Sequence, residues 1–221
     1  TLPKQFVDAG LDLNQHWQLY LPTLLGSFFL MVPFMIAAIR KQKERQMFSA
    51  AVLLLTISLV SFWLLSGTMW QLILLVLLFF TAFNYLEATM PSILSRIAPA
   101  GVKGTVMGIY SSSQFMGAFV GGVVGGAVAS QYGEKTIFIV MAGICLLWFV
   151  ISLGMQALKK SKSFSFATSI HCEIEADRIA EQIIAMPGVV EATLVQDDAV
   201  AYLKLDDKVA DIKAIKALLN P

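Results

Sequence analysis

The sequence contains few cysteines and lacks the common catalytic motifs, and each absence excludes a class of protein. The two cysteines lie in an apolar run (Cys145) and in a polar tail (Cys172), so a disulfide framework is excluded. Phosphate-binding loops, zinc-protease helices and serine-nucleophile elbows are also missing from the sequence. We therefore predict a protein that is not an enzyme and that needs no cofactor or metal.

Charged residues are few and unevenly divided. They make up 14% of the chain, and residues 164–221 hold 10 acidic against 5 basic side chains. The remainder holds 5 acidic against 11 basic side chains. An acidic tail lacks the basic footprint that nucleic-acid binding requires. We predict a tail domain at 161–221 that follows a membrane domain at 1–160.

Long apolar runs are the feature that the sequence has in abundance. Each is about 20 residues or longer, enough for a helix to cross ~30 Å of hydrocarbon. The runs are Tyr20–Ile39, Met47–Leu65, Trp70–Ile97, Gly104–Ser130 and Thr136–Leu158. The chain is therefore predicted to be an integral membrane protein with an all-α bundle, in contact with membrane lipid.

Basic residues gather at alternate ends of these runs, which predicts the orientation of the chain. The basic connections include Arg96 and Lys103, and also the first connection with Arg40, Lys41, Lys43 and Arg45. Because such residues stay in the cytoplasm, we expect the tail to be cytoplasmic. The acidic tail then either docks on the basic 40–45 loop or is simply a solvated surface.

The beginning of the chain predicts a fragment. No basic n-region or cleavage-like site precedes Trp17, so we expect no signal peptide. Thr1-Leu2-Pro3 is also not a typical start. We expect a fragment without its upstream helices, or a chain that was cut in a connection.

The tail alternates strand and helix patterns. We predict strands at 164–174, 189–195 and 199–205, with a hairpin turn at 196–198. Helices are predicted from Ala176 to Ile184 and from Val209 to Leu219. The order βαββα lacks one strand of a ferredoxin-like unit.

The third run contains a carboxylate at membrane depth. Glu87 lies about 13 Å of helical rise before Arg96, and Asn84 precedes it by one turn. An ionisable residue there is a candidate functional site, because hydrocarbon favours its neutral form. Two interpretations remain open: Glu87 exchanges a proton or binds substrate, or it is a protonated packing residue.

The fourth run has polar residues at a similar depth and a row of glycines. Gln114 and Ser111 either line one cavity with the third run or bond to it across a dry interface. The row of Gly117, Gly121 and Gly125 is either a static seam or a surface on which bundles rock. In the third run, Pro91 predicts a kink that permits gating.

Two segments of the sequence resemble known families. Arg96-Ile97-Ala98-Pro99-Ala100-Gly101-Val102-Lys103-Gly104 and the helix after it look like the junction of helices ten and eleven in a major facilitator superfamily transporter. The whole chain is similar to helices eight to twelve and the cytoplasmic tail of a bacterial inner-membrane member. The stretch 169–205 resembles heavy-metal-associated domains, but only His171-Cys172 stands where those carry Cys-x-x-Cys. We therefore expect no metal there.

The transporter resemblance implies a twelve-helix fold in two halves with alternating access. It implies proton-driven efflux of small molecules or drugs, with the N-terminal half as partner and the tail as a regulatory domain. The 40–45 loop keeps basic residues but lacks the Gly and Asp of the superfamily's loop motif. The alternative function is a non-transporting membrane sensor whose tail binds a ligand or partner.

Overall fold

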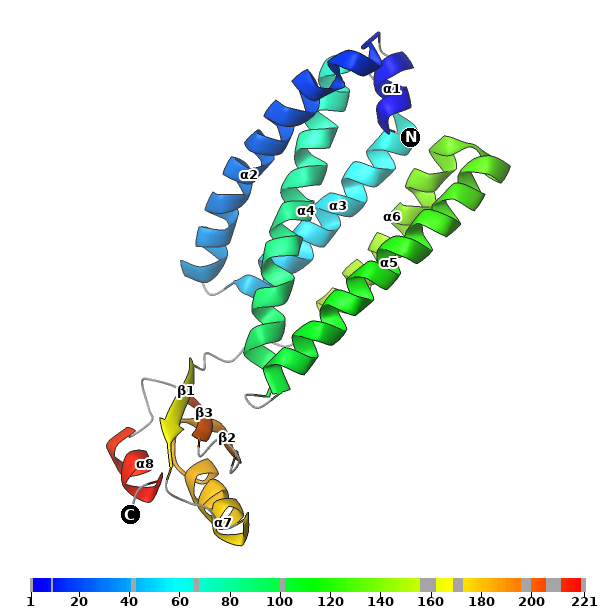
Figure 1. Ribbon diagram of the computed structural model, residues 1–221. Helices are drawn as coiled ribbons and strands as arrows, with labels where there is room; N and C mark the ends of the chain where they lie inside the picture. The colour runs from blue at the N-terminus through cyan, green and yellow to red at the C-terminus, as the bar shows by residue number, and fades with distance from the viewer. Residues whose placement is uncertain are drawn as a thin grey trace. The chain divides into compact units, whose positions relative to one another are not determined.

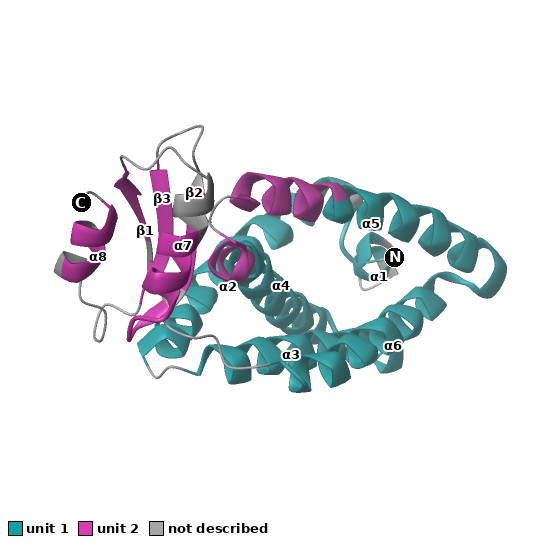
Figure 2. Cartoon of the chain, turned by 90° about the horizontal axis from the view of Figure 1, so that it is seen from below, with its two compact units in different colours: residues 1–91, 113–158 teal, residues 92–112, 159–221 magenta. Residues whose placement is uncertain are grey.

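The chain forms two compact units, which Figure 2 separates by colour. Unit 1 comprises residues 1–91 and 113–158, and unit 2 comprises residues 92–112 and 159–221. The structure is a computed structural model that describes residues 2–8, 10–40, 43–65, 68–99, 102–155, 162–168, 173–195, 200–205 and 212–219.

Five helices of the described chain are long and apolar enough to cross a membrane. They are α2 (His16–Arg40), α3 (Glu44–Leu64), α4 (Met69–Ile97), α5 (Lys103–Tyr132) and α6 (Glu134–Leu153), all labelled in Figure 1. Each predicted run falls on one helix. The last helix ends at Leu153 instead of Leu158, because the amide of Gly154 turns back to the carbonyl of Ile151 at 3.0 Å.

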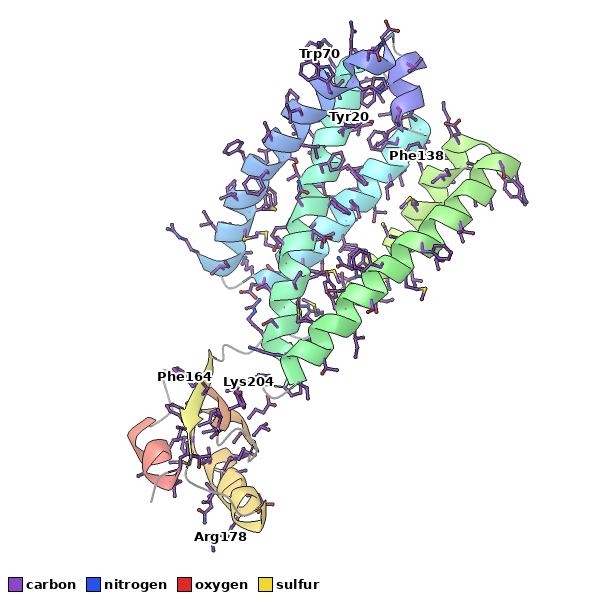
Figure 3. All side chains as sticks on the ribbon, in the orientation of Figure 1. Tyr20, Trp70, Phe138, Phe164, Arg178 and Lys204 are labelled. Atoms are coloured by element: carbon purple, nitrogen blue, oxygen red, sulfur yellow. The ribbon has the colours of Figure 1, made fainter. Side chains whose placement is uncertain are left out.

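Helices α3 and α6 of unit 1 pack against each other. Helix α3 buries nine residues, among them Phe62, which is fully buried. The Phe62 ring stacks on Phe138 (labelled in Figure 3) with centroids 5.4 Å apart. The hydroxyl oxygens of Ser49 and Ser152 lie 3.0 Å apart near the other end of the same pair. Aromatic packing and a buried polar contact thus join the two helices along their length.

A short helix that the hydropathy pattern did not predict precedes the bundle. Helix α1 (Leu2–Asp8) and the 3-10 turn η1 (Leu13–Gln15) lead into α2. The fully buried Phe6 ring meets His16 at 5.9 Å and Tyr20 at 5.6 Å between centroids. The Gln5 amide donates to the carbonyl of Phe62 at 3.2 Å. Helix α1 is therefore packed onto the start of α2 and the end of α3.

The tail in unit 2 contains a three-stranded antiparallel sheet. Its elements follow in the order β1 (Lys162–Ala167), α7 (Glu173–Ile184), β2 (Val189–Val195), β3 (Val200–Leu205) and α8 (Ile212–Leu219). The strand order is β1-β3-β2, so β3 is central and antiparallel to both neighbours. Side chains from β3 and both helices form its core, namely Ile179, Ile183, Ala201, Leu203, Leu205, Ile215 and Leu219.

The predicted first strand of the tail was too long. Strand β1 ends at Ala167, and the chain is already helical at Glu173. Glu and Ala are frequent from Glu173 onward, and both favour a helix over a strand. The predicted hairpin turn at 196–198, His171 and Cys172 lie outside the described residues.

Candidate functional site

The polar residues of α4 make different contacts. Asn84 is half-buried, and its side-chain amide donates to the hydroxyl of Ser27 on α2 at 2.9 Å. Ser27 is fully buried, and its own hydroxyl donates to the carbonyl of Leu24 at 2.7 Å. Asn84 thus connects α4 to α2 through a hydrogen bond from its side-chain amide.

The sequence of α2 contains a signal for this contact. Ser27 follows Gly26, and two small residues let helices approach closely. A Cβ added to Gly26 would lie 3.3 Å from the Leu77 side chain of α4. The Gly-Ser pair of α2 therefore marks a point of contact between α2 and α4.

Glu87 and Gln114 are brought together by α4 and α5 of unit 1. The Gln114 side-chain amide donates to one carboxylate oxygen of Glu87 at 3.1 Å. Both side chains are exposed in this chain, in contrast to the half-buried Asn84. Since glutamine carries both a donor and an acceptor, it can pair with a charged or a protonated carboxyl. The pair is thus a polar contact between α4 and α5 at an exposed position.

Ser111 and Pro91 are two further residues that the sequence singled out. Ser111 is exposed and lies in the part of α5 that belongs to unit 2. Pro91 follows Glu87 by one turn inside α4. Because proline has no N–H, position 91 gives no helical hydrogen bond to the Glu87 carbonyl. Pro91 therefore weakens the helix backbone at the residue that carries the carboxylate.

Aromatic rings continue the same face of α4. Phe83 lies one turn before Glu87, and 44% of its surface is exposed. Its ring stacks almost parallel to Phe79, with centroids 6.2 Å apart and planes 8° from each other. A carboxylate and an exposed ring one turn apart can together bind an organic cation, by charge and by cation–π attraction.

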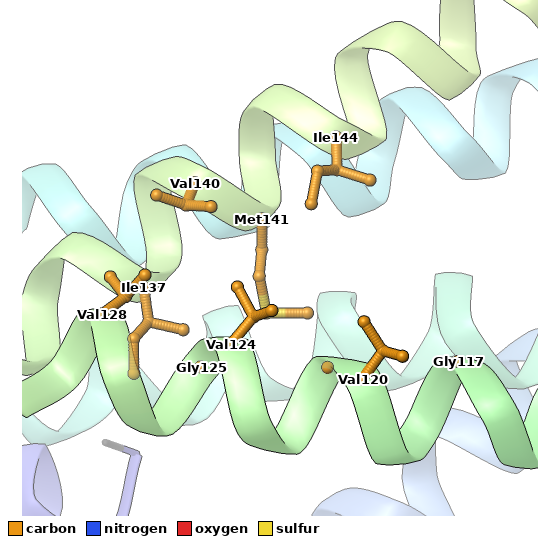
Figure 4. A pocket seen from close by; sticks show the side chains of 10 residues that line it. Gly117, Val120, Val124, Gly125, Val128, Ile137, Val140, Met141 and Ile144 are labelled. Atoms are coloured by element: carbon orange, nitrogen blue, oxygen red, sulfur yellow. The ribbon is translucent and has the colours of Figure 1, made fainter.

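The glycine row of α5 lines an apolar cavity between α5 and α6. The cavity holds about 320 Å³. Figure 4 shows valine side chains of α5 opposite Ile137, Met141 and Ile144 of α6. Added Cβ atoms on Gly117, Gly121 and Gly125 would have no described neighbour within 4 Å. In the described chain these glycines therefore face open space.

The basic connection before α3 has one contact that was not predicted. The Arg45 guanidinium donates to the carbonyl of Leu153, the last residue of α6. A cation at this point satisfies an unpaired carbonyl and interacts favourably with the helix dipole. Arg40 and Lys43 are exposed, and Lys41 lies outside the described residues.

Comparison with known sequences identifies the family. Residues 9–196 match the Major Facilitator Superfamily, which is most of the chain. The chain belongs to this superfamily. The resemblance inferred from the junction of α4 and α5 is thereby confirmed. Within the described residues, no three His, Cys, Asp or Glu side chains are grouped so that they could hold a metal ion.

Individual relatives in the superfamily are transporters by name. The chain is 35% identical over 216 residues to the inner membrane transport protein YajR of Escherichia coli K12, covering 96% of the chain and 46% of that protein. It is also 35% identical over 118 residues to an uncharacterised transporter of Buchnera aphidicola subsp. Acyrthosiphon pisum, covering 53% of the chain and 30% of that protein. The chain thus spans less than half the length of these curated relatives.

Proposed function

We propose that this chain is the C-terminal portion of a secondary active transporter of the bacterial inner membrane, which exports small molecules or drugs in exchange for protons. Membership of the superfamily and the name of the Escherichia coli relative support a transporter. They favour it over the alternative of a non-transporting sensor, and both support a protein that is not an enzyme. Sites in secondary transporters lie near the midplane between repeats.

The observation that carries the proposal is the hydrogen bond between Glu87 and Gln114. It holds a carboxylate at mid-helix on a surface where both side chains are exposed. A carboxylate in hydrocarbon needs a partner, a proton or a cation. We propose that Glu87 takes up a proton or a cationic substrate and that Gln114 pairs with either form. We also propose that Asn84 and Ser111 contribute to proton coupling or substrate binding.

The complete transporter supplies the remaining partners. We propose a second half that completes the cavity, membrane lipid around the bundle, and small-molecule substrate and protons as the transported species, with no role for nucleic acid. The glycine row and Pro91 are proposed to let the halves rock between two states. The alternative for the glycine row is a static packing seam.

We further propose that residues 161–221 are a cytoplasmic ferredoxin-like regulatory domain after a membrane domain at 1–160. The strand order β1-β3-β2, with α7 between the outer strands, is that of a split βαβ unit and supports this assignment. Docking of its acidic surface on Arg40, Lys41, Lys43 and Arg45 is a separate proposal, which rests on opposite charge alone.

An infrared pH titration of the full-length protein in liposomes tests the role of Glu87. If Glu87 exchanges a proton, the parent protein shows a pH-dependent carboxyl band that is absent from Glu87→Gln. Glu134→Gln, at the first turn of α6, is the matched control and should keep the band. Glu87→Gln should also abolish export of a lipophilic cation driven by a pH gradient. A Glu87 band that does not change with pH, together with intact export by Glu87→Gln, would contradict proton coupling through Glu87. No export by the parent protein would favour the sensor.

A further inference from the structure

The central strand of the tail sheet presents two chemically different faces. Ala201, Leu203 and Leu205 point to one face, where they pack with α7 and α8. Because side chains alternate along a strand, Tyr202 and Lys204 belong to the other face. Within the described residues, the helices of the tail contribute their buried side chains to the first face. The second face is therefore available to a different part of unit 2.

Lys204 is unusual on this second face because it is buried. Only 4% of the residue is exposed. Its ammonium lies 2.8 Å from a carboxylate oxygen of Glu191, which stands opposite it on β2. A register shift between Val189 and Glu191 creates this pairing, as β-bulges re-aim side chains. The bulge thus gives the buried cation its counter-charge.

The remaining donors of Lys204 reach the end of α4, within unit 2 (Figure 3). The ammonium donates to the carbonyl of Ala98 and, at 3.4 Å, to that of Ile97. Ile97 is the last residue of α4, where helix carbonyls lack internal partners and carry partial negative charge. Ala98 is only 3% exposed. All three N–H bonds of the ammonium therefore have an acceptor.

We propose that Lys204 is a latch by which the tail domain restrains α4 and slows transport. The latch consists of Lys204, Glu191 and the carbonyls of Ile97 and Ala98. A buried ammonium without acceptors is strongly destabilising, so opening the latch must return the Lys204 ammonium to water. This inference rests on the proposed transport function only for its effect on rate. The docking itself stands on the contacts alone.

The path to the transport site is α4 itself. This helix runs from Met69 to Ile97, and its latched end follows Glu87 by ten residues, with Pro91 between them. A contact that favours one position of the helix end shifts the population toward the state in which it forms. Opening the latch should therefore release α4 and raise the turnover rate about fivefold, a typical size for coupling between sites.

Spin-label distance measurements on the full-length protein in liposomes test the docking without any transport assay. Labels at Val102 and Ala217, both exposed and both in unit 2, measure the distance between the start of α5 and helix α8 of the tail. The two native cysteines of this chain are first replaced by Cys145→Ala and Cys172→Ser. We expect one narrow distribution for the parent protein and a broad one for Lys204→Met and Glu191→Gln. Lys204→Arg keeps a cation and should stay close to the parent.

Arg178→Met is the matched control, because Arg178 is an exposed cation of the same domain. It should leave the distribution narrow. Hydrogen exchange of the β3 amides shows whether the tail of the Lys204→Met variant is still folded. If exchange is faster than in the parent protein, Glu191→Gln serves as the test variant instead. A narrow distribution in both latch variants would overturn the docking. A broad distribution with an unchanged export rate would overturn the restraint on transport. If the parent protein shows no export at all, the proposed transport function is overturned instead.

Discussion

Helices α3 and α5 are both long enough to span a membrane, yet the described chain surrounds them very differently. Half of the most apolar window of α3 is buried, and none of that of α5. Helix α3 also has the higher mean hydropathy, 2.2 against 1.3. The helix with more polar and small residues is thus the one that the chain leaves uncovered.

The difference follows from what each helix presents. Helix α3 offers large side chains such as Phe48 and Phe62, which meet rings of α6. Helix α5 offers glycines and polar residues such as Gln114, which donates to the Glu87 carboxylate. Burial by rings favours a fixed pair of helices, whereas a smooth face with a polar spot suits a surface that changes partners. The candidate site accordingly lies on the uncovered side of the bundle.

The largest effect is expected where α3 is most buried. Phe62→Ala would remove a fully buried ring that stacks on Phe138 and contacts Phe79. We expect a loss of about 3 kcal/mol or more in the free energy of unfolding, because the site cannot collapse around the cavity. Unfolding of the chain in mixed detergent micelles measures this loss.

Phe119→Ala on α5 is the matched control, since the Phe119 side chain is 69% exposed. Its expected loss is below about 0.5 kcal/mol, as for other surface substitutions. Equal losses in the two variants would contradict the contrast between α3 and α5.

A smaller effect is expected at the contact between α2 and α4. Asn84→Ala removes the hydrogen bond to Ser27 and should destabilise the chain by about 0.6–2 kcal/mol. Ser27→Ala should cost a similar amount, and the double variant should lose less than the sum, because both break one bond. Strict additivity in the same unfolding assay would mean that the two side chains do not interact.

Much of the fold was predictable because helices and strands leave periodic patterns. The five membrane runs each became one helix, and β2 was predicted with its bounds. The contacts of single side chains were not predictable, because they depend on which helices become neighbours. Arg45 on the end of α6, Ser27 beneath Asn84 and Lys204 on the end of α4 pair across more than 50 residues.

The candidate site was predicted only in part, because the contacts of a side chain depend on how its helix is rotated. Glu87 and Gln114 were singled out by their depth, and the structure pairs them. Their depth could be counted along each helix, but the rotation of each helix could not. Asn84, one turn from Glu87, instead contacts α2. Lys204 gave no signal at all, since its partner depends on a bulge in β2 and on carbonyls, which every residue carries.

The smallest effect on stability is expected for alanine substitutions at Gly26 and Gly121, two helical glycines that the sequence does not distinguish. Alanine at Gly26 would press on Leu77 of α4 at 3.3 Å, whereas alanine at Gly121 would meet nothing within 4 Å in the described chain. Alanine favours a helix over glycine by about 0.8–1 kcal/mol. Gly121→Ala should therefore keep most of this gain, and Gly26→Ala should lose part of it to the clash.

Unfolding of the chain and of the full-length protein, measured side by side, sharpens this last contrast. Gly121→Leu should leave the 221-residue chain within about 0.5 kcal/mol of the parent, because its side chain enters open space. The same substitution should destabilise the full-length protein if another part of it packs on the glycine face of α5. If neither protein responds, no further part of the protein packs on these glycines, and they are not a surface on which two halves rock.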